Sequence, residues 1–412
     1  MPNLVVFRQK ANLPVATFVC FSMLLAACSG SGSSPGGQSP DQSLGQQQGS
    51  DGVVSSGPDA RDEVITPKPL PAAPAVGLLT KLTERGAQPG HMQAVSDGSI
   101  FVSTVSHEAT HMDGDSGNII LRVAPDGEIV DEIQVLNDGS DSRGSILGIA
   151  VYDQHLYATI RGPYSTVKIN PATYEQEVFA TYPTLPLCDA TQLASNGTNG
   201  EYAECAATTT AYGQIPQGMV FLPDGSLLQT DEGQAVVWRV PAGGGEAEVW
   251  YSDIRFDGFF GLIDIEASDD GKTIWLLLDF PTNPSAAGLW QLTVDDTGKP
   301  AAAATQLWVA PSNDAPFGLE LTVDGEFYIS NTLGNQVVKL AADGSEISRF
   351  PNAVDNSNAE NEIDGLAGIQ LIGNRLIYGS QSFATSNRDL WALYGSEVED
   401  MGRPLPAVFS GQ

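Results

Sequence analysis

The chain has 412 residues, of which 42% are hydrophobic and 17% charged, and its formal net charge at pH 7 is −31. A field of this sign repels the phosphates of nucleic acids and anionic lipid head groups, which argues against a nucleic-acid-binding protein. It suits cations and cationic ligands, or simply keeps an exported protein soluble. The 44 glycines and 26 prolines punctuate many short segments, a composition that favours an all-β protein.

The N-terminus has the parts of an export signal. Arg8 and Lys10 precede an apolar run from about Leu13 to Ala27, which is shorter than the ~20 residues needed to span a bilayer. The run ends in Leu25-Ala26-Ala27-Cys28, which resembles the bacterial lipobox, where the signal is cut before a cysteine whose thiol carries a diacylglycerol. We therefore expect residues 1–27 to be removed and Cys28 to be lipidated. The alternative is an ordinary signal with a chance cysteine.

Residues 28–75 should form a lipidated cysteine and a disordered tether. The segment is rich in Ser, Gly, Gln and Pro, and such a chain cannot offset the entropy of folding. Its r.m.s. reach is on the order of 40 Å. By the sorting rule of bacterial lipoproteins, Ser29 in place of Asp implies the outer membrane of a Gram-negative host. We expect a monomer in the cell envelope, facing the periplasm or the surface, that touches the membrane through its lipid anchor alone.

A repeated unit organises the rest of the chain and is clearest in residues 316–350. An apolar alternating strand runs into the Asp324-Gly325 turn, and a second strand, a third strand and another Asp-Gly turn follow. The turn between the first and second strands recurs six times, at Asp97-Gly98, Asp153-Gln154, Asp224-Gly225, Asp270-Gly271, Asp324-Gly325 and Gly373-Asn374. Repeats of about 40 to 50 residues with four strands each predict an all-β, six-bladed β-propeller over residues 76–412.

Third strands recur too, and the last is predicted at Leu390–Leu393. Little obvious strand follows it, so the sixth blade lacks an outer strand. Residues 76–82, just after the tether, alternate suitably to supply it, and an N-terminal strand in this position would close the ring by main-chain hydrogen bonds. Residues 407–410 are the competing candidate.

The 316–350 unit resembles NHL-type repeats, and the six-fold array is similar to the gluconolactonase and senescence-marker-protein family over roughly residues 76–395. The resemblance implies a ligand site at the channel mouth, with a divalent cation, usually calcium, held by acidic or amide residues just before the Gly that opens a first strand. Those positions here are Pro89, Leu147, Gln217, Phe260, Phe317 and Ala367. Only Gln217 could ligate, whereas calcium takes six to eight oxygens, so the family's metal cage is not reproduced.

Other acids could rebuild a cation site. Asp257 and Asp364 occupy the same point of a repeated Asp-Gly loop, and Asp264 shares one strand face with Glu266. With Gln217, the three aspartates are our candidate ligands for calcium or another divalent cation. The alternative is that Asp before Gly makes loop turns and caps its own backbone.

The histidines offer a second possible centre. His107-Glu108-Ala109-Thr110-His111 matches the His-Glu-x-x-His pattern of zincins, but the segment lies between two predicted strands and lacks the helix that this chemistry needs. A looser cluster of His91, His107 and His111 could bind zinc or another transition metal, or transfer a proton. Streptogramin-lyase-like and paraoxonase-like propellers, which this fold resembles, use channel histidines. The alternative is a set of solvated loop histidines.

Cys188 and Cys205 lie in an insertion, residues 183–216, between the second and third blades. In an oxidising compartment they should form a disulfide. Because the insertion joins a fourth strand to a first strand, it belongs to the channel face, where it would act as a stapled lid. The alternative is a loop without a binding role that the disulfide merely stabilises.

Two hypotheses about function remain. The first is a lipid-anchored propeller that binds a small molecule, a polymer or a protein at its channel face. The second is a metal-dependent lactonase, ester hydrolase or lyase that uses the rearranged acids or the histidines. Fold alone does not decide between them.

Overall fold

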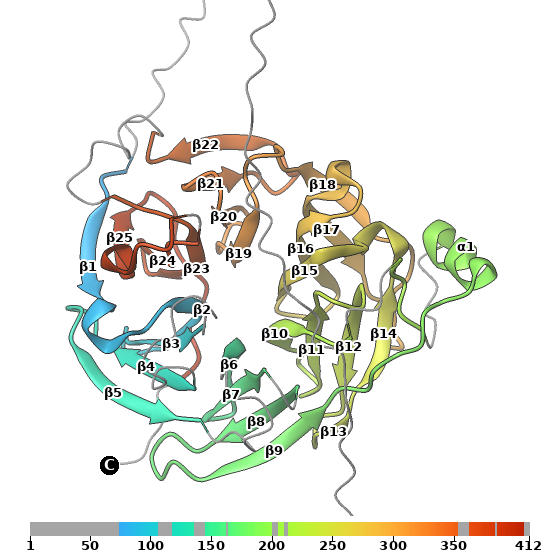
Figure 1. Ribbon diagram of the computed structural model, residues 1–412, viewed down its shortest axis with the longest axis horizontal. Coiled ribbons are helices and arrows are strands. Elements are labelled where there is room, and N and C mark those ends of the chain that lie inside the picture. The colour runs from blue at the N-terminus through green and yellow to red at the C-terminus, as the bar shows by residue number, and fades with distance from the viewer. Residues whose placement is uncertain are drawn as a thin grey trace, which may run out of the picture. The chain divides into compact units, whose positions relative to one another are not determined.

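The computed structural model describes residues 74–105, 118–135, 145–161, 164–199, 205–209, 213–352, 362–383 and 385–407. All belong to a compact unit that begins at Pro69. Six sheets surround a central axis (Figure 1), so the predicted six-bladed β-propeller is confirmed. The predicted signal, Cys28 and most of the tether lie outside the described residues.

Each blade consists of four antiparallel strands. From the innermost strand outward, blade 1 is β2 (Pro89–Ala94), β3 (Ile100–Thr104), β4 (Ile119–Val123) and β5 (Ile129–Gln134); blade 2 is β6 (Ile146–Tyr152), β7 (His155–Ile160), β8 (Ser165–Ile169) and β9 (Gln176–Thr181); blade 3 is β10 (Pro216–Phe221), β11 (Leu227–Asp231), β12 (Val236–Val240) and β14 (Glu248–Ser252). Blade 4 is β15 (Gly258–Ala267), β16 (Thr273–Pro281), β17 (Gly288–Thr293) and β18 (Thr305–Val309); blade 5 is β19 (Pro316–Leu321), β20 (Phe327–Asn331), β21 (Gln336–Leu340) and β22 (Glu346–Phe350); blade 6 is β23 (Leu366–Ile372), β24 (Arg375–Ser380), β25 (Ala392–Glu397) and β1 (Gly77–Lys81).

A few short elements decorate the blades. The two-residue strand β13 (Gly245–Glu246) pairs in parallel with β9, which links blade 3 to the outer edge of blade 2. The insertion contains the helix α1 (Ala190–Asn199), and single 3₁₀ turns lie at Thr83–Arg85, Ile254–Phe256, Pro284–Ala286 and Arg388–Leu390. None of the helices in the described part of the chain is long and apolar enough to cross a membrane.

The predicted turns between first and second strands are present. In blade 2 the non-glycine residues Asp153 and Gln154 adopt φ of 43° and 59°, the left-handed pair of a tight two-residue hairpin. The third strand of blade 6 begins at Ala392 and not at the predicted Leu390, because Arg388–Leu390 forms a 3₁₀ turn. The backbone N–H of Asp389 donates to Asn387 Oδ1 at 3.1 Å and holds that turn.

The ring is closed by the N-terminal strand, as predicted. β1 pairs antiparallel with β25, from Gly77 opposite Gly395 to Lys81 opposite Ala392, and it lies on the outside of blade 6 (Figure 1). Just beyond it, the Leu82 N–H donates to the Trp391 carbonyl oxygen at 2.9 Å. The competing residues 408–410 lie outside the described part of the chain.

Apolar side chains fill the space between neighbouring blades. One buried cluster lies at each of the six interfaces, and each takes residues from both adjoining sheets. The aromatic residues of the outer strands contribute here, as the fully buried Trp238 at the interface of blades 2 and 3 illustrates. Since a four-stranded blade has two faces, it is stable only with a neighbour on each side.

Leu82→Ala tests the closure. Leu82 is fully buried in the cluster between blades 6 and 1, so the substitution should lower the free energy of unfolding by about 2–5 kcal/mol through lost burial and a cavity. Leu78→Ala, in the same segment but 42% exposed, should change it by less than about 0.5 kcal/mol. Urea titrations of both variants measure the difference, and equal effects would contradict closure by β1.

Candidate functional site: the central channel

The innermost strands approach one another closely around the axis, and each contacts the innermost strands of two neighbouring blades. Glycines allow this. A Cβ on Gly218 of β10 would lie 2.6 Å from the Asp264 Cα of β15, and one on Gly368 of β23 would lie 2.7 Å from the Gly90 carbonyl oxygen of β2. Side chains next to these glycines are therefore brought together on the axis.

His91 projects from β2 into this crowded region and is only 5% exposed. Its ring centre lies 5.1 Å from that of Phe317 in blade 5, and its Nδ1 lies 3.9 Å from Asp264 Oδ1 in blade 4. Burial lowers the pKa of His91 to about 4, and contact with the Gln217 side chain in blade 3 offsets part of the effect. The imidazole is thus neutral at pH 7, and its Nε2 has no hydrogen-bond partner among the described residues.

Asp264 is held beside the histidine by main-chain donors. Its Oδ2 accepts from the Leu319 N–H at 2.9 Å and its Oδ1 from the Ile265 N–H at 3.0 Å. Burial raises its pKa to about 8 and the nearby charge of Glu266 adds to the rise, although the backbone hydrogen bonds oppose it. A cavity of about 40 Å³, room for a few water molecules, lies against His91, Asp264 and Glu266.

Polar side chains continue along the channel beyond this cavity, away from the insertion. Gln370 Nε2 donates to Glu320 Oε2 at 3.0 Å, and Gln370 Oε1 accepts from the Ala94 N–H at 2.8 Å. Burial raises the pKa of Glu266 to about 7 and that of Glu320 well above its usual range, and Arg403 opposes both shifts. Arg403 Nη1 lies 3.2 Å from Glu266 Oε2.

Two further acids lie at the other end, where the insertion is attached. Burial raises the pKa of Glu232 to about 8, against contact with Gln217 and the charge of Arg161. Burial and repulsion from Glu232 raise the pKa of Asp279 well above its usual range. Glu232 and Asp279 are 4% and 7% exposed, and within the described part of the chain Asp279 Oδ1 has no hydrogen-bond partner. Gln217 thus connects the axial His91 with this acid pair.

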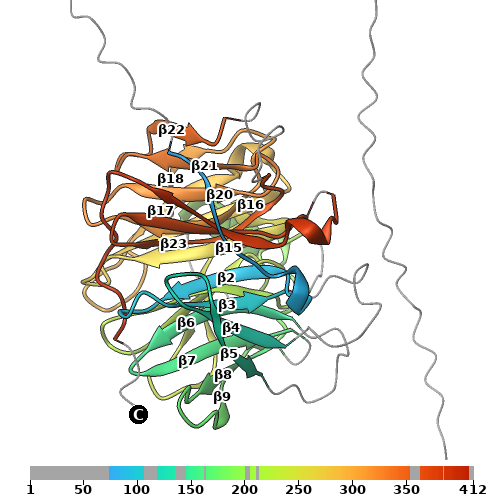
Figure 2. The same ribbon diagram turned by 90° about the vertical axis from the view of Figure 1, so that its left-hand side faces the viewer.

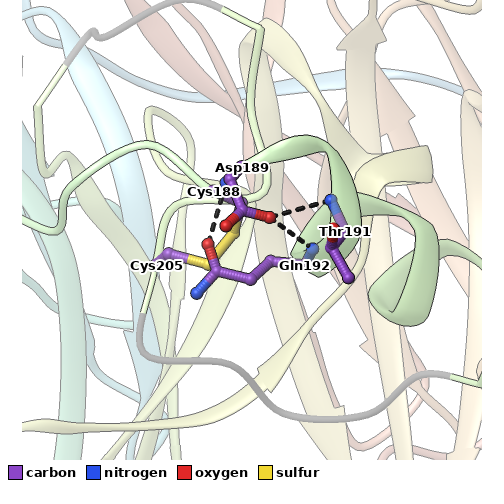
Figure 3. Close-up of a disulfide and its surroundings, with 5 residues drawn as sticks. All are labelled: Cys188, Asp189, Thr191, Gln192 and Cys205. Atoms are coloured by element: carbon purple, nitrogen blue, oxygen red, sulfur yellow. Dashed lines mark hydrogen bonds between the residues drawn. A yellow bond between two sulfur atoms is a disulfide. The ribbon is translucent and has the colours of Figure 1, made fainter.

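The insertion is stapled and anchored beside the acid pair. Cys188 and Cys205 form the predicted disulfide, and Figure 3 shows Asp189 next to it, with its carboxylate accepting from the Thr191 and Gln192 N–H groups at the start of α1. Leu185 N–H donates to Gln234 Oε1 at 2.7 Å, two residues after Glu232. We call the described parts of this insertion, residues 183–199 and 205–209, the lid; its helix α1 lies at the outer edge of the ring beside β14 (Figure 1), so the predicted position over the channel mouth is not seen for α1.

Asp257 and Asp364 fasten loops. Asp257 Oδ1 accepts from the Thr209 N–H at 3.1 Å and its Oδ2 from the Thr209 hydroxyl at 2.7 Å, so it holds the end of the lid. Asp364 Oδ2 accepts from the Ser382 hydroxyl at 2.8 Å and from the Thr385 hydroxyl. Of the predicted ligands, then, Gln217, Asp264 and His91 come together on the axis, while Asp257 and Asp364 are engaged in loop contacts.

The predicted histidine cluster lies only partly within the described residues. His107 and His111 lie outside the described residues, so their role stays a prediction. Within the described ranges there is no group of three His, Cys, Asp or Glu side chains placed to hold a metal ion. The residues before the opening glycines, apart from Gln217, carry no side-chain oxygen, so these positions by themselves do not supply the six to eight oxygens that calcium takes.

Sequence reasoning missed Glu232, Asp279 and Glu320. Glu232 directly follows Asp231 at the end of the second strand of blade 3, and Asp279 lies within the apolar run of β16. A lone acid inside such a run is the one signal that could have identified Asp279, because buried carboxylates are rare without a partner.

The fold and this channel define a six-bladed propeller with a buried polar axis and a stapled lid. No protein-family model matches the chain, and no curated protein matches its sequence. Its fold is similar to that of the calcium-binding protein regucalcin from Agrobacterium tumefaciens, at 14% identity over 78% of this chain and 93% of that chain, with a TM-score of 0.52.

Two other solved structures share the fold. A luciferin-regenerating enzyme is 11% identical over 81% of this chain and 99% of that chain, with a TM-score of 0.52. A putative gluconolactonase is 13% identical over 81% of this chain and 95% of that chain, with a TM-score of 0.50. The protein is therefore a β-propeller of the regucalcin and gluconolactonase type in fold, as its repeats predict. At these identities the likeness extends to the fold alone.

Asp264→Asn should change the pH dependence of stability. Between about pH 4 and 8 the folded protein keeps a proton on Asp264 that the unfolded chain releases, so the free energy of unfolding falls as pH rises through this window. The variant should flatten the fall by up to about 1.4 kcal/mol per pH unit, the value for one proton. Urea titrations between pH 5 and 8 measure the slope.

Asp224→Asn is the matched control. Burial raises the pKa of Asp224, but hydrogen bonds from Ser226 and the charge of Arg239 outweigh it, and the net pKa lies below the usual range. Its stabilising effect is therefore fully present between pH 5 and 8, and its loss should shift the whole curve without changing the slope. An unchanged slope for Asp264→Asn would show that Asp264 is ionised in the folded state.

Proposed function

We propose that this protein is a lipid-anchored binding protein of the cell envelope that takes a small organic cation, such as a primary ammonium, at the lid end of its channel. The observation that carries the proposal is the buried pair of Glu232 and Asp279, whose carboxyl groups repel each other while Asp279 Oδ1 has no partner.

Charge favours a cation at this pair. The charge of Arg161 favours the ionised form of Glu232, whereas the charge of the neighbouring Asp231 opposes it. Removing carboxylates from water costs several kcal/mol per ion unless they are protonated or paired. A bound cation would replace the proton that the raised pKa values imply. An ammonium brings three donors, enough for Glu232, Asp279 and one further oxygen.

Burial limits the size of the ligand. Since Glu232 and Asp279 are 4% and 7% exposed, only a narrow group can reach them, which favours a small molecule over a polymer or a protein. The lid is attached beside the pair through Gln234 and Asp257, so a ligand there would touch it. A metal-dependent lactonase, ester hydrolase or lyase is the alternative, and it requires ligands beyond those in the described residues.

n-Butylamine and n-butanol, which share a chain length, test the proposal by their effect on the melting temperature. The amine should raise it and the alcohol should not, since only a ligand that binds the folded state selectively stabilises it. Because Glu232 must ionise to bind, amine affinity should increase as pH rises through about 8. Glu232→Gln and Asp279→Asn should each weaken binding about tenfold or more, on the order of 1.4 kcal/mol.

Asp296→Asn provides the control, because it removes the same charge from an exposed site and should leave amine binding unchanged. Equal stabilisation by amine and alcohol, or an equal loss in the Asp296 variant, would overturn the proposal. Stoichiometric calcium or zinc in the purified protein, with a fall in melting temperature on chelation, would instead support the metal-dependent enzyme.

The lipid anchor has its own test. Cys28→Ala should move the protein from the detergent phase to the aqueous phase in Triton X-114 partitioning, because the thiol that carries the acyl chains is gone. Cys188→Ala with Cys205→Ala removes the two cysteines of the disulfide and should leave partitioning unchanged. A Cys28 variant that stays in the detergent phase would refute the lipobox interpretation.

A further inference from the structure

The chain does not end with its last strand but crosses the propeller. We call residues 399–407 the strap. Asp400 accepts from Lys339 Nζ at 2.7 Å, and the Met401 carbonyl oxygen accepts from the Val323 N–H at 3.0 Å. The Gly402 N–H donates to the Gly373 carbonyl oxygen at 2.7 Å, and the Pro406 carbonyl oxygen accepts from the Ser96 N–H at 2.9 Å.

These partners fix the path of the strap. Ser96, Val323 and Gly373 lie in the turns between first and second strands of blades 1, 5 and 6, which is the end of the ring opposite the lid. Arg403 reaches the corresponding turn of blade 4, where its Nη2 lies 2.5 Å from Asp269 Oδ1. Blades 1 and 4 face each other across the axis of a six-bladed ring (Figure 1). The backbone of the strap thus contacts blades 5, 6 and 1 in turn, and the Arg403 side chain reaches blade 4 at this end of the channel.

Arg403 meets the channel wall itself. Its Nη1 donates to the Ala267 carbonyl oxygen at 3.0 Å and lies 3.2 Å from Glu266 Oε2. Glu266 lines the same cavity as His91 and Asp264. The guanidinium therefore lies directly behind the cavity wall, and the planar fork of an arginine suits two acids and a carbonyl better than a single ammonium does.

We infer that the strap closes the channel at the end opposite the lid, and that Glu266, Asp269 and the Ala267 carbonyl form a guanidinium-binding site that Arg403 of the same chain fills as a latch. The channel is then a blind pocket, and small molecules reach His91 from the lid end only. This inference does not depend on which ligand the lid end takes.

Backbone packing reinforces the latch. A Cβ on Gly402 would lie 2.1 Å from the Leu371 carbonyl oxygen, so the strap lies flat against blade 6 at the residue before Arg403. Leu405, two residues after the latch, packs on the apolar cluster between blades 6 and 1. The strap is thus held at both ends, and Arg403 holds its middle.

Carbethoxylation of His91 by diethyl pyrocarbonate, read by peptide mass spectrometry on the folded full-length protein, tests the inference. The reagent attacks neutral imidazole, and burial keeps His91 neutral. Arg403→Ala should raise the rate at His91 about tenfold, the effect of losing one charge-assisted hydrogen bond. Methylguanidinium should return the rate towards that of the unaltered protein, while methylammonium at the same concentration should do so less.

Two further variants keep the test decisive. Arg375→Ala removes an arginine that bonds the Pro125 carbonyl oxygen and should leave the His91 rate unchanged. Gly402→Ala lifts the strap without removing a charge, so it should expose His91 to a similar degree, and methylguanidinium should not reverse it. The inference is overturned if the His91 rate is unchanged in both strap variants while their melting temperatures confirm folded protein. It is equally overturned if the rate increases in Arg403→Ala and methylguanidinium fails to reverse the increase.

Discussion

The structure depends on the packing of each blade between two neighbours. A four-stranded sheet with apolar side chains on both faces cannot bury either face alone, and in this protein a separate apolar cluster fills each of the six interfaces. The arrangement therefore has to close on itself. The pairing of β1 with β25 joins the two ends of the repeat region and completes the outer side of blade 6, which packs against blade 1.

Closure of the ring also determines the environment of the side chains on the channel axis. Six innermost strands converge, and glycines such as Gly218 and Gly368 let their backbones nearly touch. Polar side chains on those strands are forced out of water and towards one another. The consequence is a neutral histidine beside carboxyl groups that hold protons at pH 7. At one end Arg403 offsets part of this charge, and at the other the acid pair of Glu232 and Asp279 lies under the lid attachment with less compensation. The two ends of the channel thus differ in how much positive charge lies near their carboxyl groups.

The sequence predicts the fold well because short local sequence patterns specify its turns and strands. Asp-Gly turns, alternating strands and a spare N-terminal strand are each readable within a few residues, and together they predict six blades and their closure. The disulfide is predictable because Cys188 and Cys205 lie close together in one insertion. The boundary error at Leu390 has a local cause as well, since a polar residue, Asn387, caps a short turn that apolar periodicity does not reveal.

The site is less predictable, because it depends on which residues of different blades meet. His91, Gln217 and Asp264 come from blades 1, 3 and 4, and no pattern along the chain shows that they share the axis. Asp257 and Asp364 look alike in sequence, yet their carboxylates are engaged by Thr209 and Ser382 from other loops. The strap escaped prediction for a related reason. Its Gly402, Pro404 and Pro406 suggest an irregular tail, and only the tertiary structure shows where such a tail runs.

The pairing of β1 with β25 has a consequence for how the molecule is made. Gly77 lies opposite Gly395, so the first strand of the propeller to emerge has to wait for one of the last before it finds its partner. Contacts of such long sequence separation are formed late, after the entropy of closing the intervening loop has been overcome. Until then blade 6 offers a bare strand edge, and incomplete folding would leave that edge free to pair with another chain. Among the segments of this protein, the junction of β1 and β25 is thus where folding is completed and where misassembly would begin.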